Sequence, residues 1–115
     1  MVVGVPMSQD EPRSDVEREF ARAMRDIYLR AKDELGYNAT YFLRMLSTDG
    51  PVQTARRLIT SSQPSEGFAT LWERRRLDLT VEAHVVQPRF QSLFTESELE
   101  AARQRLESYG YSAES

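Results

Sequence analysis

The chain has 115 residues, of which 40% are hydrophobic and 29% are charged, and this is the size and composition of one globular domain. It contains no cysteine, which excludes disulfide bonds, thiolate metal ligands and a cysteine nucleophile. Its formal net charge of -3 argues against the overall basic charge of a typical nucleic-acid-binding protein and leaves room only for a local basic surface.

Residues 1–13 show no sustained hydrophobic period and contain Pro6 and Pro12, so we expect a flexible lead-in before the folded domain. The apolar stretch at the start is too short for a signal peptide and has no basic residues before it. No stretch approaches the roughly 20 apolar residues that a membrane-spanning helix needs. We therefore expect a cytoplasmic protein that does not engage a membrane.

The longest predicted helix covers residues 14–35. Ser14 and Glu17 have the spacing of a capping box, and Gly36 is typical of the position that follows a helix. Between them, apolar residues recur every three or four positions and so share one helical face: Val16, Phe20, Met24, Ile27, Ala31 and Leu35. We expect this face to pack in the core, with pairing to a second copy as the alternative.

Two shorter helices are predicted next. Asn38 is expected to cap a helix that ends near Ser47. The Asp49-Gly50-Pro51 segment interrupts the helical pattern, and Pro51 suits the first turn of a third helix that ends near Ile59. The polar residues 61–64 then read as a loop.

The centre of the domain is predicted at residues 65–86. Ser65 is expected to cap a fourth helix that turns Phe68, Leu71 and Trp72 inward. The segment Leu77-Asp78-Leu79-Thr80 separates it from a fifth helix, which either Asp78 or Thr80 caps and which Pro88 ends.

The C-terminal part is predicted to begin with a short apolar segment, which we call the apolar step, and to end with the last helix. Phe90, Leu93 and Phe94 form the step, and Thr95 with Glu98 makes a second capping box. The last helix runs to Gly110, and residues 111–115 are expected to fray. The sequence therefore predicts an all-α fold: one compact domain at residues 14–110, with five to seven helices.

No catalytic set, cofactor site or metal site is predicted. His84 is the only histidine, it has no adjacent nucleophile, and we expect it at the edge of the buried face, either half-buried or on the surface. The five glycines do not cluster into a phosphate-binding loop. Asp78 and Glu82 are four residues apart and are predicted to share a helical face, so an enzyme that uses these carboxylates would need a pocket enclosing both.

Nucleic-acid binding is the alternative function. Residues 38–59 have the pattern of a helix-turn-helix, and Gln53, Thr54, Arg56 and Arg57 are predicted to face outward from its second helix. The run Arg74, Arg75 and Arg76 would extend a basic surface. The acidic residues around that run, and the acidic charge of the whole chain, argue against this reading.

The leading hypothesis is a non-enzymatic helical domain that acts by binding another protein or a second copy of itself. Tyrosine, tryptophan and arginine are enriched at protein interfaces, and this chain has more aromatic side chains than so small a core can bury completely. The residues predicted to contact the partner are Arg56, Arg57, Arg74, Arg75 and Arg76.

Several short segments between residues 26 and 111 carry a resemblance: Gly36-Tyr37-Asn38, Phe42-Leu43-Arg44-Met45, Thr54-Ala55-Arg56-Arg57-Leu58-Ile59, Gly67-Phe68 with Leu71-Trp72-Glu73, Arg76-Leu77-Asp78-Leu79-Thr80-Val81-Glu82, and Leu93-Phe94-Thr95 with Glu98-Leu99. Together they resemble a small bacterial family of short helical proteins without an established activity. The resemblance implies a helical fold and carries over no catalytic residue, cofactor or partner.

Overall fold

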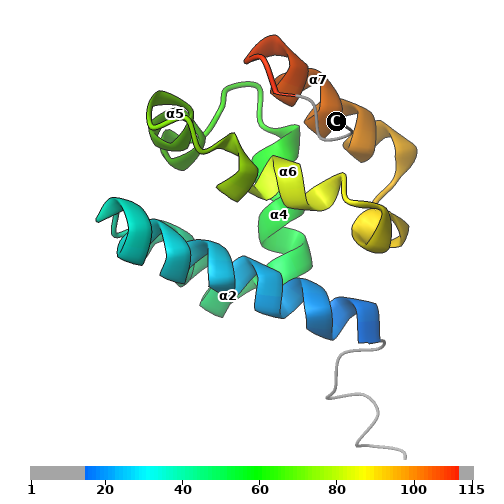
Figure 1. Cartoon of the computed structure of the whole chain (residues 1–115). Helices are drawn as coiled ribbons and strands as arrows, with labels where there is room; N and C mark the ends of the chain where they lie inside the picture. Colours follow the sequence, from blue (N-terminus) through cyan, green and yellow to red (C-terminus); the bar gives the residue numbers. More distant parts are fainter. Residues whose placement is uncertain (1–14, 112–115) are drawn as a thin grey trace, which may run out of the picture.

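The computed structural model describes residues 15–111, which form six α-helices and two short 3-10 helices (Figure 1). No strand occurs within this range. The predicted all-α single domain with five to seven helices is therefore confirmed. The predictions made for residues 1–13, for the Ser14 cap and for the tail beyond residue 111 lie outside the described residues.

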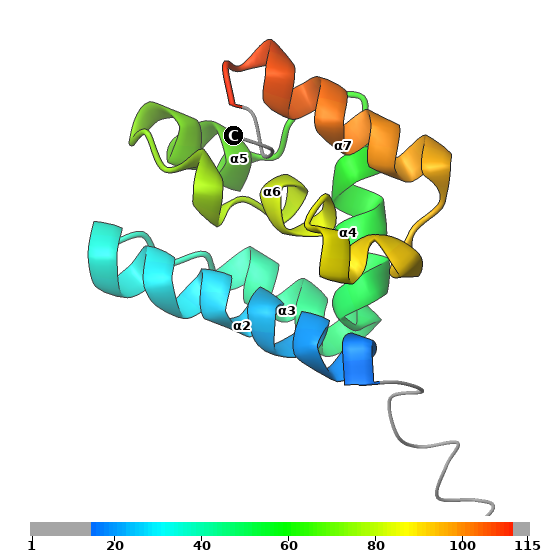
Figure 2. The same cartoon turned by 45° about the vertical axis from the view of Figure 1, so that its right-hand side comes forward.

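The helices form two layers that one central helix connects. They are α2 (Asp15–Leu35), α3 (Thr40–Asp49), α4 (Pro51–Thr60), α5 (Glu66–Glu73), η1 (Leu77–Leu79), α6 (Val81–Val85), η2 (Pro88–Leu93) and α7 (Glu96–Ser108). In Figure 2, α2 and α3 lie in the lower layer and α7 in the upper one, with α6 between them. Helix α4 runs between the two layers and contacts α2, α3, α6 and α7.

The apolar face of α2 forms one wall of the core, as the sequence predicts. Its buried residues are Phe20, Met24, Ile27 and Ala31. The Phe20 ring meets the rings of Phe90 and Phe94 edge to face, with centroids 5.0 and 5.5 Å apart. Such aromatic contacts add to the free energy of area burial, so the predicted apolar step around Phe90 serves to close the core against α2.

The predicted side-chain caps of α5, α6 and α7 are confirmed. The Ser65 hydroxyl accepts a hydrogen bond from the Phe68 amide at 3.0 Å. Thr80, the second of the two predicted alternatives, caps α6. Thr95 and Glu98 form the complete capping box of α7. These bonds satisfy amides that have no partner inside their own helix.

The predicted Asn38 cap is wrong. Ala39 precedes α3, and no side chain caps that helix. The Asn38 side-chain oxygen instead accepts a hydrogen bond from the Tyr28 hydroxyl at 2.8 Å. This bond ties the link between α2 and α3 back onto α2, so the acceptor that would have capped α3 is used in a tertiary contact.

The predicted burial of Trp72 is also wrong, because its side chain is 45% exposed. Phe68 and Leu71 already fill the inward face of α5. Tyr109, which follows α7, covers only one side of the indole, with ring centroids 5.3 Å apart in an edge-on arrangement. Trp72 therefore lies at the border of the core, with much of its ring in solvent.

Helix α5 ends in a Schellman motif that has an arginine where glycine is usual. The Arg75 amide donates to the Trp72 carbonyl at 3.0 Å, and the Arg76 amide donates to the Leu71 carbonyl at 2.7 Å. Arg75 adopts a φ of 63°, and it is the only non-glycine residue with positive φ between residues 15 and 111. A side chain in this left-handed region costs free energy that glycine would avoid.

Candidate interaction surfaces and a candidate pocket

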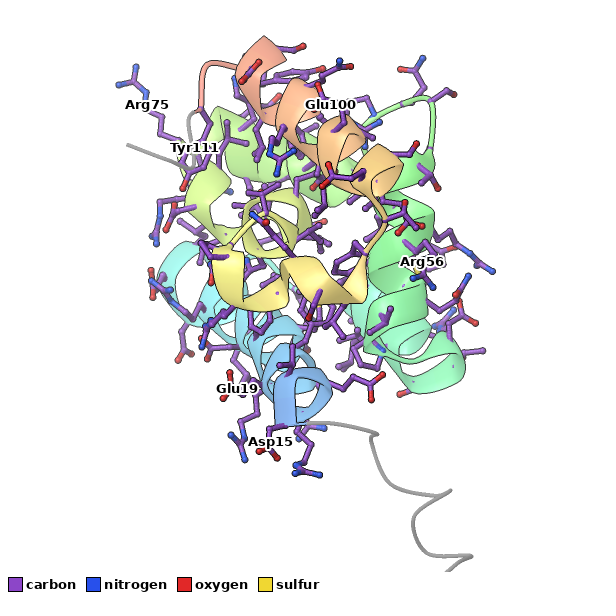
Figure 3. The ribbon with its side chains drawn as sticks, turned by 90° about the vertical axis from the view of Figure 1, so that its right-hand side faces the viewer. Asp15, Glu19, Arg56, Arg75, Glu100 and Tyr111 are labelled. Carbon is purple, nitrogen blue, oxygen red and sulfur yellow. The ribbon has the colours of Figure 1, made fainter. Side chains whose placement is uncertain are left out.

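The five predicted partner-binding arginines do not share one surface, and Arg56 has a structural role. Its Nε donates to Glu98 Oε2 at 2.7 Å and its Nη2 donates to the Leu93 carbonyl at 3.2 Å. The guanidinium also lies 5.9 Å from the centre of the Phe94 ring. Figure 3 shows Arg56 on α4. The side chain thus fastens α4 to the junction of η2 and α7.

The predicted helix-turn-helix has an interior second helix. Thr54, predicted to face outward, is fully buried, and its hydroxyl donates to the Met45 carbonyl at 3.0 Å. Arg57 pairs with Asp49 across the turn between α3 and α4, at 3.3 Å. The outward prediction for Thr54 is wrong because packing on both layers leaves α4 only a narrow exposed face.

Arg74 and Arg76 connect the end of α5 to the end of α2. Arg76 donates to both carboxylate oxygens of Asp78, at 3.0 and 3.1 Å, and to Glu34 Oε1 at 2.7 Å. Arg74 donates to the Leu35 carbonyl at 3.0 Å. The hydrogen bonds from Arg76 hold the pKa of Asp78 below its usual value. These two arginines are therefore engaged within the fold.

Arg75 differs from the other four predicted arginines. Its side chain makes no hydrogen bond or ion pair with any residue between 15 and 111, and it projects away from the ribbon in Figure 3. Trp72 lies one turn earlier, and Tyr109 packs against that indole. We call Trp72, Arg75 and Tyr109 the Trp72 surface; Trp72 and Arg75 lie at the C-terminal end of α5, and Tyr109 lies at the C-terminal end of α7.

A pocket of about 440 Å³ opens between α2, α3, α5 and the η1–α6 segment. Its volume lies within the range of small-molecule sites. Most of its walls are apolar: Ile27, Ala31, Phe42, Met45, Leu58, Phe68, Leu71, Leu79 and Val81. Polar side chains contribute at a few points, namely Tyr37, Asn38, Thr40, Ser65, Glu66, Thr80 and Glu82.

Glu82 is the buried carboxylate of this pocket, with 2% of its surface exposed. Its Oε2 accepts a hydrogen bond from Arg105 Nη1 at 3.1 Å. Burial raises the pKa of Glu82, although Arg105 acts in the opposite direction. From the sequence, Glu82 was considered only together with Asp78, as a possible pair of catalytic carboxylates. Its burial could have been suspected because it is the single acid among the apolar residues Val81, Ala83 and Val85.

The two carboxylates considered for an enzyme do not share a site. Asp78 belongs to η1, is exposed and does not line the pocket, whereas Glu82 is buried in α6. The predicted shared face is wrong because the 3-10 turn ends at Leu79 and Thr80 starts a new helix. His84 is half-buried as expected, and its Nδ1 donates to the Thr80 carbonyl at 2.8 Å.

Comparisons with protein families, with curated proteins and with solved structures found no match for this chain. Among residues 15–111, no group of three or more histidine, aspartate or glutamate side chains is placed to hold a metal ion. None of the helices in this range combines the length and apolar character needed to cross a membrane. The resemblance to a bacterial family stays a prediction.

Proposed function

We propose that the protein is a non-enzymatic helical domain that binds another protein through the Trp72 surface. The observation that carries this proposal is that Trp72 is 45% exposed and that Arg75, three residues later, has a side chain without a hydrogen-bond or ion-pair partner among the described residues. Tryptophan, tyrosine and arginine are the residues that most often dominate binding free energy at protein interfaces.

The fold prepares Trp72 for binding. Tyr109 packs against one side of the indole, and this contact limits the rotamers that the side chain can adopt. A side chain that is already ordered loses less conformational entropy when a partner covers it. Covering the rest of the ring removes further apolar area from water, which favours association.

Arg75 follows Trp72 by three residues and would supply a charged contact to the partner. Its guanidinium has no acceptor among residues 15–111 and could donate two parallel hydrogen bonds to a carboxylate of the partner. Arg56, Arg57, Arg74 and Arg76 already donate to acceptors within the chain. Of the five arginines predicted to bind a partner, Arg75 is therefore the one that supports the proposal.

Nucleic-acid binding has less support from the same geometry. Arg56, Arg57 and Arg76 each face a carboxylate of Glu98, Asp49 or Asp78, so acids interrupt any basic surface they form. Labelled duplex and single-stranded nucleic acid, titrated across a salt series, test this alternative. Tight binding that weakens steeply with salt and drops in an Arg56/Arg57 double alanine variant would favour it over protein binding.

The protein-binding proposal is tested by affinity capture from an extract of the source organism, with light scattering after size exclusion to detect self-association. Trp72→Ala and Arg75→Ala baits should lose the partner that the unaltered bait retains. Leu29→Ala is the matched control, because Leu29 is 48% exposed on α2 and lies outside the Trp72 surface. A monomer that captures nothing, or a partner retained by Trp72→Ala, would contradict the proposal.

A further inference from the structure

The charged side chains that line the pocket between α2, α3 and α5 are both acidic. Glu66 and Glu82 are its carboxylates, and no arginine, lysine or histidine lines it among residues 15–111. Arg105 offsets the charge of Glu82 from the α7 side. Glu66 belongs to the first turn of α5 and is exposed; the helix N-terminus and solvent offset part of its charge, but no cationic side chain among residues 15–111 lines the pocket beside it.

Four aromatic residues line the pocket. Tyr37 comes from the link after α2, Tyr41 and Phe42 come from α3, and Phe68 comes from α5. The face of an aromatic ring carries partial negative charge and attracts ammonium groups. A ring that turns its face to the cavity adds to the preference that the carboxylates set, and all four residues supply apolar area.

Tyr37 connects the rings to the Glu66 carboxylate. A β-carbon placed on Gly67 would lie 3.8 Å from the Tyr37 hydroxyl, so this hydroxyl sits beside the first turn of α5. Burial and the nearby Glu66 charge raise the pKa of Tyr37. Tyr37 and Glu66 therefore meet in the part of the pocket wall at the start of α5.

From this arrangement we infer that the pocket binds a small organic cation, an ammonium ion that carries an apolar or aromatic group. The ammonium lies near Glu66 and the aromatic rings, and the apolar group lies against Met45, Leu71 and Ile27. Anionic ligands are excluded because they would enter a negatively charged pocket without a cationic side chain to receive them. This inference does not depend on partner binding at the Trp72 surface.

Three soluble probes of matched shape test the inference: benzylammonium, neutral benzyl alcohol and anionic benzoate. Each is titrated into the full chain labelled with ¹⁵N, and amide shifts are followed by NMR. Benzylammonium should shift amides around the pocket, Gly67 and Phe42 among them, and should bind about tenfold more tightly than benzyl alcohol. Benzoate should cause no shifts there.

Glu66→Gln is the decisive variant, with Glu73→Gln as its control. Glu73 ends the same helix, is exposed and does not line the pocket. Glu66→Gln should weaken benzylammonium binding several-fold and leave benzyl alcohol unchanged, whereas Glu73→Gln should change neither. Equal binding of the alcohol and the cation would show a purely apolar site and overturn the inference. Equal effects of the two variants, or no shift at the pocket with millimolar probe, would also overturn it.

Discussion

Arg105 and Glu82 form an ion pair in the interior, with their side chains only 11% and 3% exposed and 3.1 Å between Nη1 and Oε2. The same guanidinium donates to the Leu58 carbonyl at 3.0 Å and to the Ser61 carbonyl. Arg105 thus joins α7 to α6, to α4 and to the loop that follows α4. The pair contributes to stability chiefly because each member satisfies a group that water cannot reach.

Arg105→Met should lower the free energy of unfolding by about 3–5 kcal/mol, because it leaves a buried carboxylate and a carbonyl without their donor. The double variant Glu82→Leu/Arg105→Met should lose less than the single variant, since no unpaired charge remains. Urea unfolding followed by circular dichroism measures both. A single variant within about 1 kcal/mol of the parent chain would show that the pair is dispensable.

Interactions between residues close in the sequence could be predicted, whereas contacts between residues far apart in the sequence could not. Thr95 and Glu98 lie three residues apart, so their capping box is visible in the sequence and is present in the structure. Glu82 and Arg105 are 23 residues apart, and no periodicity links them. Their pairing depends on how α7 crosses α6, which is decided only when the whole core assembles.

The candidate binding surface and the pocket also depend on contacts between segments that are far apart in the sequence. The arginines stand out as a group in the sequence, but whether each side chain is free to bind a partner depends on its neighbours in the folded chain. The Arg56 side chain bonds to Glu98, which is 42 residues away in the sequence, whereas the Arg75 side chain has no hydrogen bond or ion pair with any described residue. The pocket was not predicted, because its walls come from five separate segments that no local pattern relates.

His84 should make the protein less stable as the pH falls below about 6.5, the ordinary pKa of histidine. Burial lowers the pKa of His84 in the folded state. The folded state therefore binds a proton less readily than the unfolded state, and the stability present above pH 6.5 is lost as the pH falls towards the folded pKa. Glu82 acts in the opposite direction. Because its pKa is raised in the folded state, protonation of Glu82 makes the protein more stable as the pH falls.

Two measurements check the histidine prediction. His84 is the only histidine, so a single imidazole resonance in an NMR titration should report a pKa below 6.5. Urea unfolding at pH 7.5 and pH 5.5 gives the free energy of unfolding at each pH. Between these two pH values, that free energy should fall less for His84→Gln than for the parent chain. An imidazole that titrates at or above the ordinary value would contradict the prediction.

Trp72→Ala should cost about 1–2 kcal/mol, which is less than the roughly 3–5 kcal/mol of a fully buried aromatic residue. The reason is that much of the indole is already in water in the folded state. Phe68→Ala is the matched comparison on the same helix, since Phe68 is buried, and it should show the full cost. Urea unfolding gives both values.

The tryptophan fluorescence supplies an independent check. Trp72 is the only tryptophan, so the emission of the folded protein reports on this one side chain. Iodide should quench it to a degree between that of a buried indole and that of the unfolded chain. Emission that iodide does not reach would mean that the indole is covered, either by the chain itself or by a second copy.

Arg75→Gly should stabilise the fold by roughly 0.5–1 kcal/mol and weaken partner binding at the same time. Glycine relieves the strain of the positive φ of 63° at the end of α5, and part of that gain is offset by the greater freedom of glycine in the unfolded chain. Arg74→Gly is the control, because Arg74 has a φ of -89° and donates to the Leu35 carbonyl; this variant should be destabilised. Urea unfolding and partner capture measure the two effects separately. If Arg75→Gly were more stable and still captured the partner, the strained arginine would have no role at the Trp72 surface.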